Sequence, residues 1–140
     1  MRILALDPAT QIGFHSEETS GSFSLGKVKP EKLITLYLFL KETIEREKIT
    51  HVVYEEPIQG HFHATVSHAN LEGIILLVCE MKGMKYMNYT PSAIKKFITG
   101  KGNASKEEVI EAVKKLGYEP VDDNEADAIA LYLLAKLELK

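Results

Sequence analysis

Short apolar runs that end in acidic residues predict a strand-rich first third of the chain. Residues 2–6 are almost all apolar and stop at Asp7, which is typical of a buried strand with an acid at its end. Residues 51–54 form a β-branched and aromatic run that stops at Glu55. Further short strands are expected around Phe14, at residues 22–25 and at residues 85–89.

Helical periodicity dominates the rest of the chain. Apolar residues recur at three- and four-residue steps from Leu33 to Ile44, after Pro30, a residue suited to a first helical turn. Residues 58–65 are expected to be a loop, and residues 66–81 a helix that is apolar on nearly every side around 74–78. Further helices are expected at residues 91–98, at 105–116 and after the Asp122–Glu125 capping pattern. This order predicts a single α/β domain over residues 1–140.

Composition is that of an ordinary globular protein. Of the 140 residues, 45% are hydrophobic and 26% are charged, which suits one domain that needs no cross-links. Cys79 is the single cysteine and cannot form an internal disulfide, which favours a reducing compartment. The first apolar run is too short for a signal peptide, and no run could span a bilayer. We therefore expect a cytosolic protein with no membrane partner.

Charge is distributed unevenly along the chain. Residues 82–115 contain eight lysines and three glutamates, whereas the last 25 residues contain two lysines and six acidic residues. A basic segment beside an acidic one suits an enzyme that grips phosphates and holds cations. On charge alone, solvated helix faces are the better interpretation.

Three acids stand where metal chemistry needs them. Asp7 and Glu55 each close a predicted buried strand, so neighbouring strands would bring their carboxylates to one edge of the sheet. Asp127 lies early in the last helix, and Asn124 shares its helical face at a spacing of three residues. Oxygen ligands of this kind suit Mg²⁺ or Mn²⁺, and two such ions can hydrolyse a phosphodiester. Singly, each acid could instead cap a turn or complement a helix dipole.

Four motifs in order resemble the RuvC family of Holliday-junction resolvases, especially its short phage-type members, over nearly the whole chain. They are Ile3–Thr10 (ILALDPAT), Val52–Pro57 (VVYEEP), Ser92–Lys106 (SAIKKFITGKGNASK) and Asn124–Leu131 (NEADAIAL).

The resemblance implies an RNase H-like fold and a nuclease that cuts Holliday junctions or other branched DNA with two Mg²⁺ (or Mn²⁺) ions. It makes Asp7, Glu55 and Asp127 catalytic metal ligands, with Glu56 pointing to the other side of the sheet. It places Lys95 and Lys106 on DNA phosphates, with Lys106 also near the scissile bond. The expected setting is the cytoplasm of a bacterium or of a phage-infected host.

One position departs from the family. Three residues before its final Asp the family has a metal ligand, often Asp or His, and this chain has Asn124. An amide can still offer a neutral oxygen to a metal, which would then be held by three carboxylates. Asp123 is an alternative ligand that we expect to face the wrong way.

Two polar segments are open to more than one interpretation. His61, His63 and His68 lack the spacing of a zinc site, and we favour a loop in which His61, Phe62 and His63 face DNA. Phe62 would stack on an unpaired base, or else anchor the loop. Residues 99–105 are glycine-rich and flanked by Lys101 and Lys106, so they could cradle a DNA phosphate or simply hold an Asn103 or Ser105 N-cap.

Two other functions remain open, an RNase H-like nuclease that processes structured RNA and a non-catalytic domain that binds nucleic acid. Retention of all three acids argues against the second. A four-way junction has two strands to cut, which predicts a homodimer, and the apolar helix at 66–81 is its expected interface, with Gly73 allowing close approach. The alternative is a helix buried within one subunit.

Overall fold

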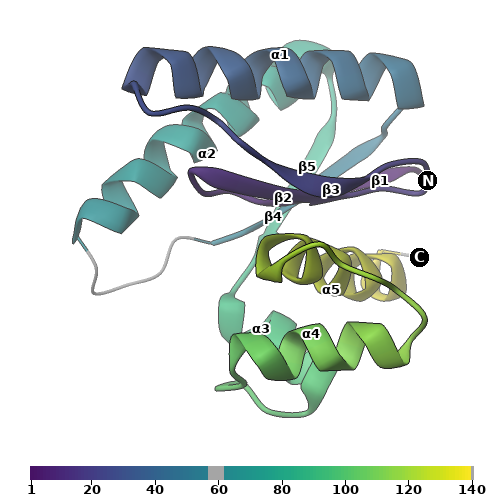
Figure 1. The fold of residues 1–140 in the computed structure, drawn as a ribbon. Helices are drawn as coiled ribbons and strands as arrows, with labels where there is room; N and C mark the ends of the chain where they lie inside the picture. Colours follow the sequence, from purple (N-terminus) through teal and green to yellow (C-terminus); the bar gives the residue numbers. More distant parts are fainter. Residues whose placement is uncertain (57–61, 140) are drawn as a thin grey trace.

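One five-stranded mixed sheet with helices on both faces makes up the fold (Figure 1). The computed structural model describes residues 1–56 and 62–139, and only the backbone of residues 62–66. The elements are β1 (Ile3–Asp7), β2 (Gln11–His15), β3 (Ser20–Ser24), α1 (Lys29–Glu47), β4 (His51–Glu55), α2 (Phe62–Lys82), β5 (Lys85–Tyr89), α3 (Pro91–Thr99), α4 (Lys106–Lys115) and α5 (Asp123–Glu138).

Strand β1 lies at the centre of the sheet, whose order is β3-β2-β1-β4-β5. β1, β2 and β3 are antiparallel neighbours, whereas β4 and β5 run parallel to β1. The helices α1 and α2 make the crossovers into the parallel strands and cover one face. The helix α5 covers the other face, with α3 and α4 stacked outside it (Figure 1).

Alternation along β1 separates two cores. Leu4 and Leu6 point towards α1 and α2, whereas Ile3 and Ala5 point towards α3, α4 and α5. Because successive side chains in a strand point to opposite faces, Asp7 continues the row of Ile3 and Ala5. The acid at the end of β1 therefore lies on the face that α5 covers.

The sequence-based fold class is confirmed, and so are the predicted strands and the order of elements. The start of α2 was predicted wrongly. This helix begins at Phe62 rather than Val66, so residues 62–65 are helical and not part of a loop. No helix-breaking residue follows Gly60 in this stretch, so helical backbone can begin before the apolar run that marks it in the sequence. Among the described residues, no helix is long and apolar enough to cross a membrane.

Candidate active site

Three carboxylates converge at one edge of the sheet. Asp7 ends β1 and Glu55 ends β4, and these strands are parallel neighbours, which is the condition that the sequence left open. Asp127 comes from α5, which packs across this face of the sheet. One carboxylate oxygen from each residue lies within 4.8 Å of the other two. The structure thus brings together residues 120 positions apart in the chain.

Electrostatics at this cluster favour a bound cation. Burial raises the pKa of Asp7 well above its usual value, and the charges of Glu55 and Asp127 raise it further. Burial, followed by the charges of Glu55 and Asp123, raises the pKa of Asp127 to about 7, against the opposing effect of Lys95 and Lys106. Like charges this close ionise together only when positive charge compensates them. Three hard oxygen donors therefore suit a divalent cation of the Mg²⁺ or Mn²⁺ type.

Serine hydroxyls of the β2–β3 hairpin fasten the start of α5. Asp122 is the N-cap and accepts the backbone N–H of Glu125 at 2.9 Å, while Ser22 donates to its other oxygen at 2.5 Å. Ser20 donates to the buried Glu125 carboxylate at 2.5 Å. The second oxygen of Glu125 accepts the N–H of Val121 at 2.8 Å, so the capping pattern is only half of a reciprocal box.

Gly13 sets how closely α5 approaches the sheet. It pairs with Asp7 across β1 and β2, and a Cβ built on it would lie 2.0 Å from the carbonyl oxygen of Asn124. The first turn of α5 thus rests on the strand backbone beside Asp7, where no other residue type fits. This role of Gly13 was not predicted from the sequence, and neither were the roles of Ser20 and Ser22. Only Gly13 carried a signal, because a glycine inside a strand often marks a close backbone approach.

The two candidates for a fourth ligand occupy different surroundings. The backbone carbonyl of Asn124 lies against Gly13, in the first turn of α5. Asp123 was expected to face the wrong way, and it is not part of the metal-ligating group found among the described residues. Its Oδ2 lies 3.4 Å from Nζ of Lys106, and its charge contributes to the raised pKa values of both Asp7 and Asp127.

Lysines of α3 and α4 border the carboxylates. The charges of Lys95 and Lys106 oppose the rise in the pKa of Asp127, so both ammonium groups lie near this carboxylate. Lys101 forms an ion pair with Glu108, whose carboxylate also accepts the N–H of Ser105 at 3.1 Å. Ser105 is the N-cap of α4, one of the two alternatives for the glycine-rich segment.

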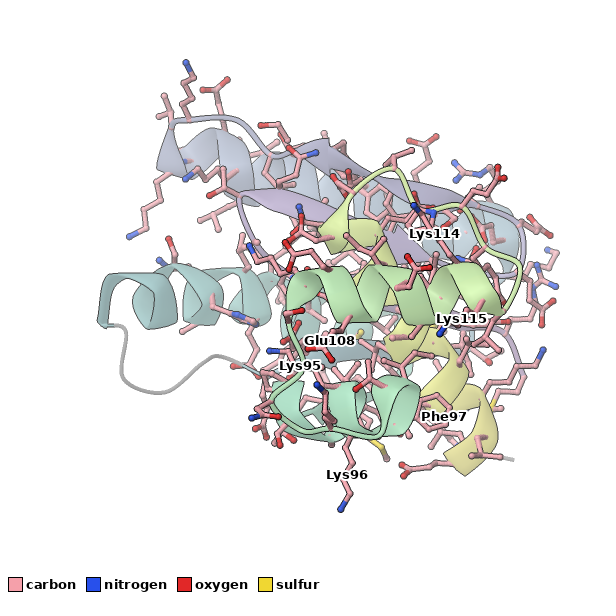
Figure 2. The ribbon with its side chains drawn as sticks, turned by 60° about the horizontal axis from the view of Figure 1, so that its bottom comes forward. Lys95, Lys96, Phe97, Glu108, Lys114 and Lys115 are labelled. Atoms are coloured by element: carbon pink, nitrogen blue, oxygen red, sulfur yellow. The ribbon has the colours of Figure 1, made fainter. Side chains whose placement is uncertain are left out.

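Further cations lie outside this group. Figure 2, which looks onto α3 and α4, shows Lys96 pointing away from the protein, while Lys95 and Glu108 lie towards the start of α4. Lys114 and Lys115 are exposed at the other end of α4. Lysines thus lie at both ends of α4, with Glu107, Glu108 and Glu111 between them.

Several of the predicted DNA contacts involve residues or side chains outside the described part of the chain. His61 lies outside the described residues, and so do the side chains of Phe62 and His63. His68 is described and belongs to α2. It is not part of any metal-ligating group found among the described residues. Instead its Nε2 lies 2.8 Å from the carbonyl oxygen of Glu55.

This mixed sheet, with acids at the ends of two adjacent parallel strands and a third acid from the last helix, defines a metal-dependent nuclease of the RNase H-like class. The family model described as "Crossover junction endodeoxyribonuclease RuvC" matches residues 24–134. The chain therefore belongs to the RuvC family of crossover junction endodeoxyribonucleases. Both the resemblance inferred from the four motifs and the predicted class of enzyme are confirmed.

Known RuvC proteins match this chain over nearly its full length, both in sequence and in structure. The crossover junction endodeoxyribonuclease RuvC of Prochlorococcus marinus strain MIT 9312 is 31% identical over 148 aligned positions, which cover 95% of this chain and 94% of the relative. The structure of Thermus thermophilus RuvC matches with a TM-score of 0.77 at 23% identity, covering 99% of this chain and 95% of that one. T. thermophilus RuvC in complex with a Holliday junction substrate matches with a TM-score of 0.79 at 22% identity, covering 97% and 93%. These structural matches confirm the fold.

Proposed function

We propose that residues 1–140 act as a single nuclease domain that resolves Holliday junctions, or cuts related branched DNA, by metal-dependent phosphodiester hydrolysis. The observation that carries the proposal is the convergence of Asp7, Glu55 and Asp127 within 4.8 Å in a member of the RuvC family. A structural relative, T. thermophilus RuvC, has been captured with a Holliday junction substrate.

The proposed cofactor is Mg²⁺ or Mn²⁺, with two ions per site. Such ions supply a water activated for attack and stabilisation of the leaving oxygen. Asp7, Glu55 and Asp127 would hold them through carboxylate oxygens, and Asn124 would add a neutral amide oxygen. Because burial raises the pKa of both Asp7 and Asp127, in the latter to about 7, protons and cations compete for these carboxylates. The residues present thus fit divalent cations without any further ligand type.

Lysines provide the proposed grip on the DNA backbone. Lys95 and Lys106 border the carboxylates, and an ammonium group there would draw the scissile phosphate towards the metal ligands. Lys106 would exchange its ion pair with Asp123 for a contact with that phosphate. Lys106 would then contribute to turnover as well as to DNA binding. Lys101 would exchange its pairing with Glu108 for a phosphate contact. Phe62, at the start of α2, is the proposed stacking partner for an unpaired base.

Cleavage of a synthetic four-way junction tests this function. We expect cutting with Mg²⁺ or Mn²⁺, none with EDTA, and slower cutting of a flap, a plain duplex and structured RNA. Asp7→Asn, Glu55→Gln and Asp127→Asn should each abolish cutting and leave junction binding intact, because losing a carboxylate does not remove a phosphate contact. Preferred cleavage of structured RNA would favour the alternative RNA-processing nuclease. Junction binding without cutting under any metal would leave a non-catalytic domain.

A homodimer is the proposed assembly, since two symmetric sites match the two strands to be cut. Ile75 and Val78 of α2 are buried within the subunit, as the alternative interpretation of this helix required. Leu77 and Met81 are nevertheless 50% and 66% exposed, and they follow Gly73 at four-residue spacing on one helical face. This strip supports an α2 interface. Sedimentation equilibrium at micromolar concentration should show twice 15.7 kDa, and a monomer that still cuts both strands would contradict it.

The proposed compartment is the cytoplasm of a bacterium or of a phage-infected host, where branched DNA occurs. The buried thiol of Cys79 would remain reduced there.

A further inference from the structure

The sheet ladder between β1 and β4 reaches a defect beside the candidate active site. Ile3 pairs with His51 in parallel register, and the N–H of His51 donates to the carbonyl of Arg2 at 3.1 Å. In a parallel ladder such a residue also accepts, through its carbonyl, the N–H of the residue after its partner. The pattern repeats every second residue. Continued to the end of β4, this pattern predicts that the carbonyl of Glu55 accepts a hydrogen bond from the N–H of residue 8.

Residue 8 is a proline, which has no N–H to donate. Pro8 is buried, and Asp7 directly before it is a proposed metal ligand. Without another donor, the carbonyl of Glu55 would lack its ladder partner at the point where the strand delivers a second proposed ligand. Unpaired polar groups of this kind in partly buried positions are destabilising, so a replacement donor is expected nearby.

His68 of α2 supplies that donor. Its Nε2 lies 2.8 Å from the carbonyl oxygen of Glu55. One helical turn later, Glu72 accepts the hydroxyl of Tyr54 at 2.5 Å. Tyr54 and Glu55 are the last two residues of β4, so two side chains four residues apart dock one face of α2 onto the end of this strand.

We infer that His68 is a positioning residue for Glu55, replacing the N–H that Pro8 cannot donate. The peptide unit between Glu55 and Glu56 is held on its other side, because the N–H of Glu56 donates to the carbonyl of Tyr89 at 2.8 Å. With His68 in place, hydrogen bonds fix both edges of this unit. The Cα of Glu55, and with it the direction of the carboxylate, is then set by the strand and the helix together. The inference rests on the proposed function only in taking Glu55 as a metal ligand.

Binding of Mn²⁺ to the DNA-free protein, measured by calorimetry, tests the inference without cleavage. Removing an outer partner of a metal ligand lowers metal affinity by about 10- to 100-fold. The peptide unit keeps one of its two bonds, so we expect His68→Leu to weaken Mn²⁺ binding by about 10-fold, at the lower end of that range. His68→Gln places an amide N–H near the position of Nε2 and should recover most of the affinity.

Two further variants separate positioning from simple packing. Pro8→Ala restores a backbone N–H to the ladder, so His68→Leu combined with Pro8→Ala should bind Mn²⁺ more tightly than His68→Leu alone. Tyr54→Phe removes the neighbouring bond between β4 and α2 without touching the carbonyl of Glu55. It should lower the free energy of unfolding but leave Mn²⁺ affinity close to that of the wild type.

The results distinguish this inference from the proposed function. Wild-type Mn²⁺ affinity in His68→Leu overturns the inference, and so does an equal loss of affinity in Tyr54→Phe and His68→Leu. Neither result affects the nuclease assignment if the wild type cuts junctions. A wild type that cuts no junction, with Mn²⁺ affinity lost in His68→Leu and recovered in His68→Gln, overturns the proposed function and supports the role of His68.

Discussion

Replacing Asp127 with asparagine should stabilise the metal-free protein at neutral and alkaline pH. In the folded state the pKa of Asp127 is about 7, against an ordinary value of 3.8, because burial and the charges of Glu55 and Asp123 oppose ionisation. At about 1.4 kcal/mol per pH unit, this difference corresponds to about 4 kcal/mol. Solvent screening of a partly exposed carboxylate reduces it, and we expect about 2 kcal/mol.

The sign follows from proton binding. Below pH 4 Asp127 is protonated in both the folded and the unfolded protein, so the pH-dependent contribution is absent. Between about pH 4 and pH 7 the unfolded chain loses the proton first, and wild-type stability falls relative to Asp127→Asn. Above pH 7 the difference between the two proteins should level off. Mg²⁺ should reverse the order at pH 8, because it binds the ionised wild-type cluster and stabilises the folded state.

Urea unfolding followed by circular dichroism, from pH 4 to pH 8.5 in EDTA, measures this difference. Glu111→Gln, which removes an exposed carboxylate on α4, is the matched control and should follow the wild type at every pH. A difference between Asp127→Asn and wild type that stays constant with pH would refute the reasoning. So would a wild type that is the more stable of the two at pH 8 in EDTA.

Three further changes test the surroundings of the carboxylates. Gly13→Ala should displace α5 and slow junction cleavage by about 100-fold, since misplacing a reacting group by an ångström has effects of that order. Gly21→Ala is the control and should cut normally, because its new Cβ would meet only the Phe14 ring at 3.4 Å. Equal cleavage rates for the Gly13→Ala and Gly21→Ala variants would contradict the role of Gly13. Lys95→Ala and Lys106→Ala should each lower the slope of log K against log salt by ~0.9 on duplex DNA, and Lys106→Ala should also slow turnover at saturating DNA. A variant of an exposed lysine on α1 is the control. If the Lys95 and Lys106 variants show the same salt slope as this control, the two lysines are solvated side chains that do not contact DNA. Asn124→Asp should lower the Mg²⁺ concentration for half-maximal cleavage and Asn124→Ala should raise it, and identical titrations would remove Asn124 from the site.

Local patterns in the sequence were enough to predict the strands and two of the three acids. Asp7 and Glu55 each follow a short apolar run, so their placement at strand ends needs only period-two alternation and run length. Asp127 carried a weaker local signal, its place early in a helix on one face with Asn124, and the resemblance to RuvC strengthened it. The start of α2 was mispredicted because its first turn lacks the apolar periodicity of the rest.

Contacts between distant residues could not be predicted in the same way. Ser20 and Glu125 are 105 residues apart, and no period along the chain links them. The bond from His68 to Glu55 depends on where α2 crosses β4, which the folded geometry alone determines. The ion pair of Asp123 with Lys106 likewise depends on where α4 lies relative to α5.

The distribution of the site along the chain has a consequence for biosynthesis. Asp7 is synthesised 120 residues before Asp127, which belongs to α5. The β1–β2 hairpin and the crossover to β4 can form earlier, but the carboxylate cluster is incomplete until α5 docks on Gly13 and the two hairpin serines. A nascent or prematurely terminated chain lacking α5 has two of the three acids and leaves one face of its sheet uncovered. Such fragments would be inert towards DNA and prone to degradation, so the ability to cut DNA arises only once α5 has been synthesised and docked.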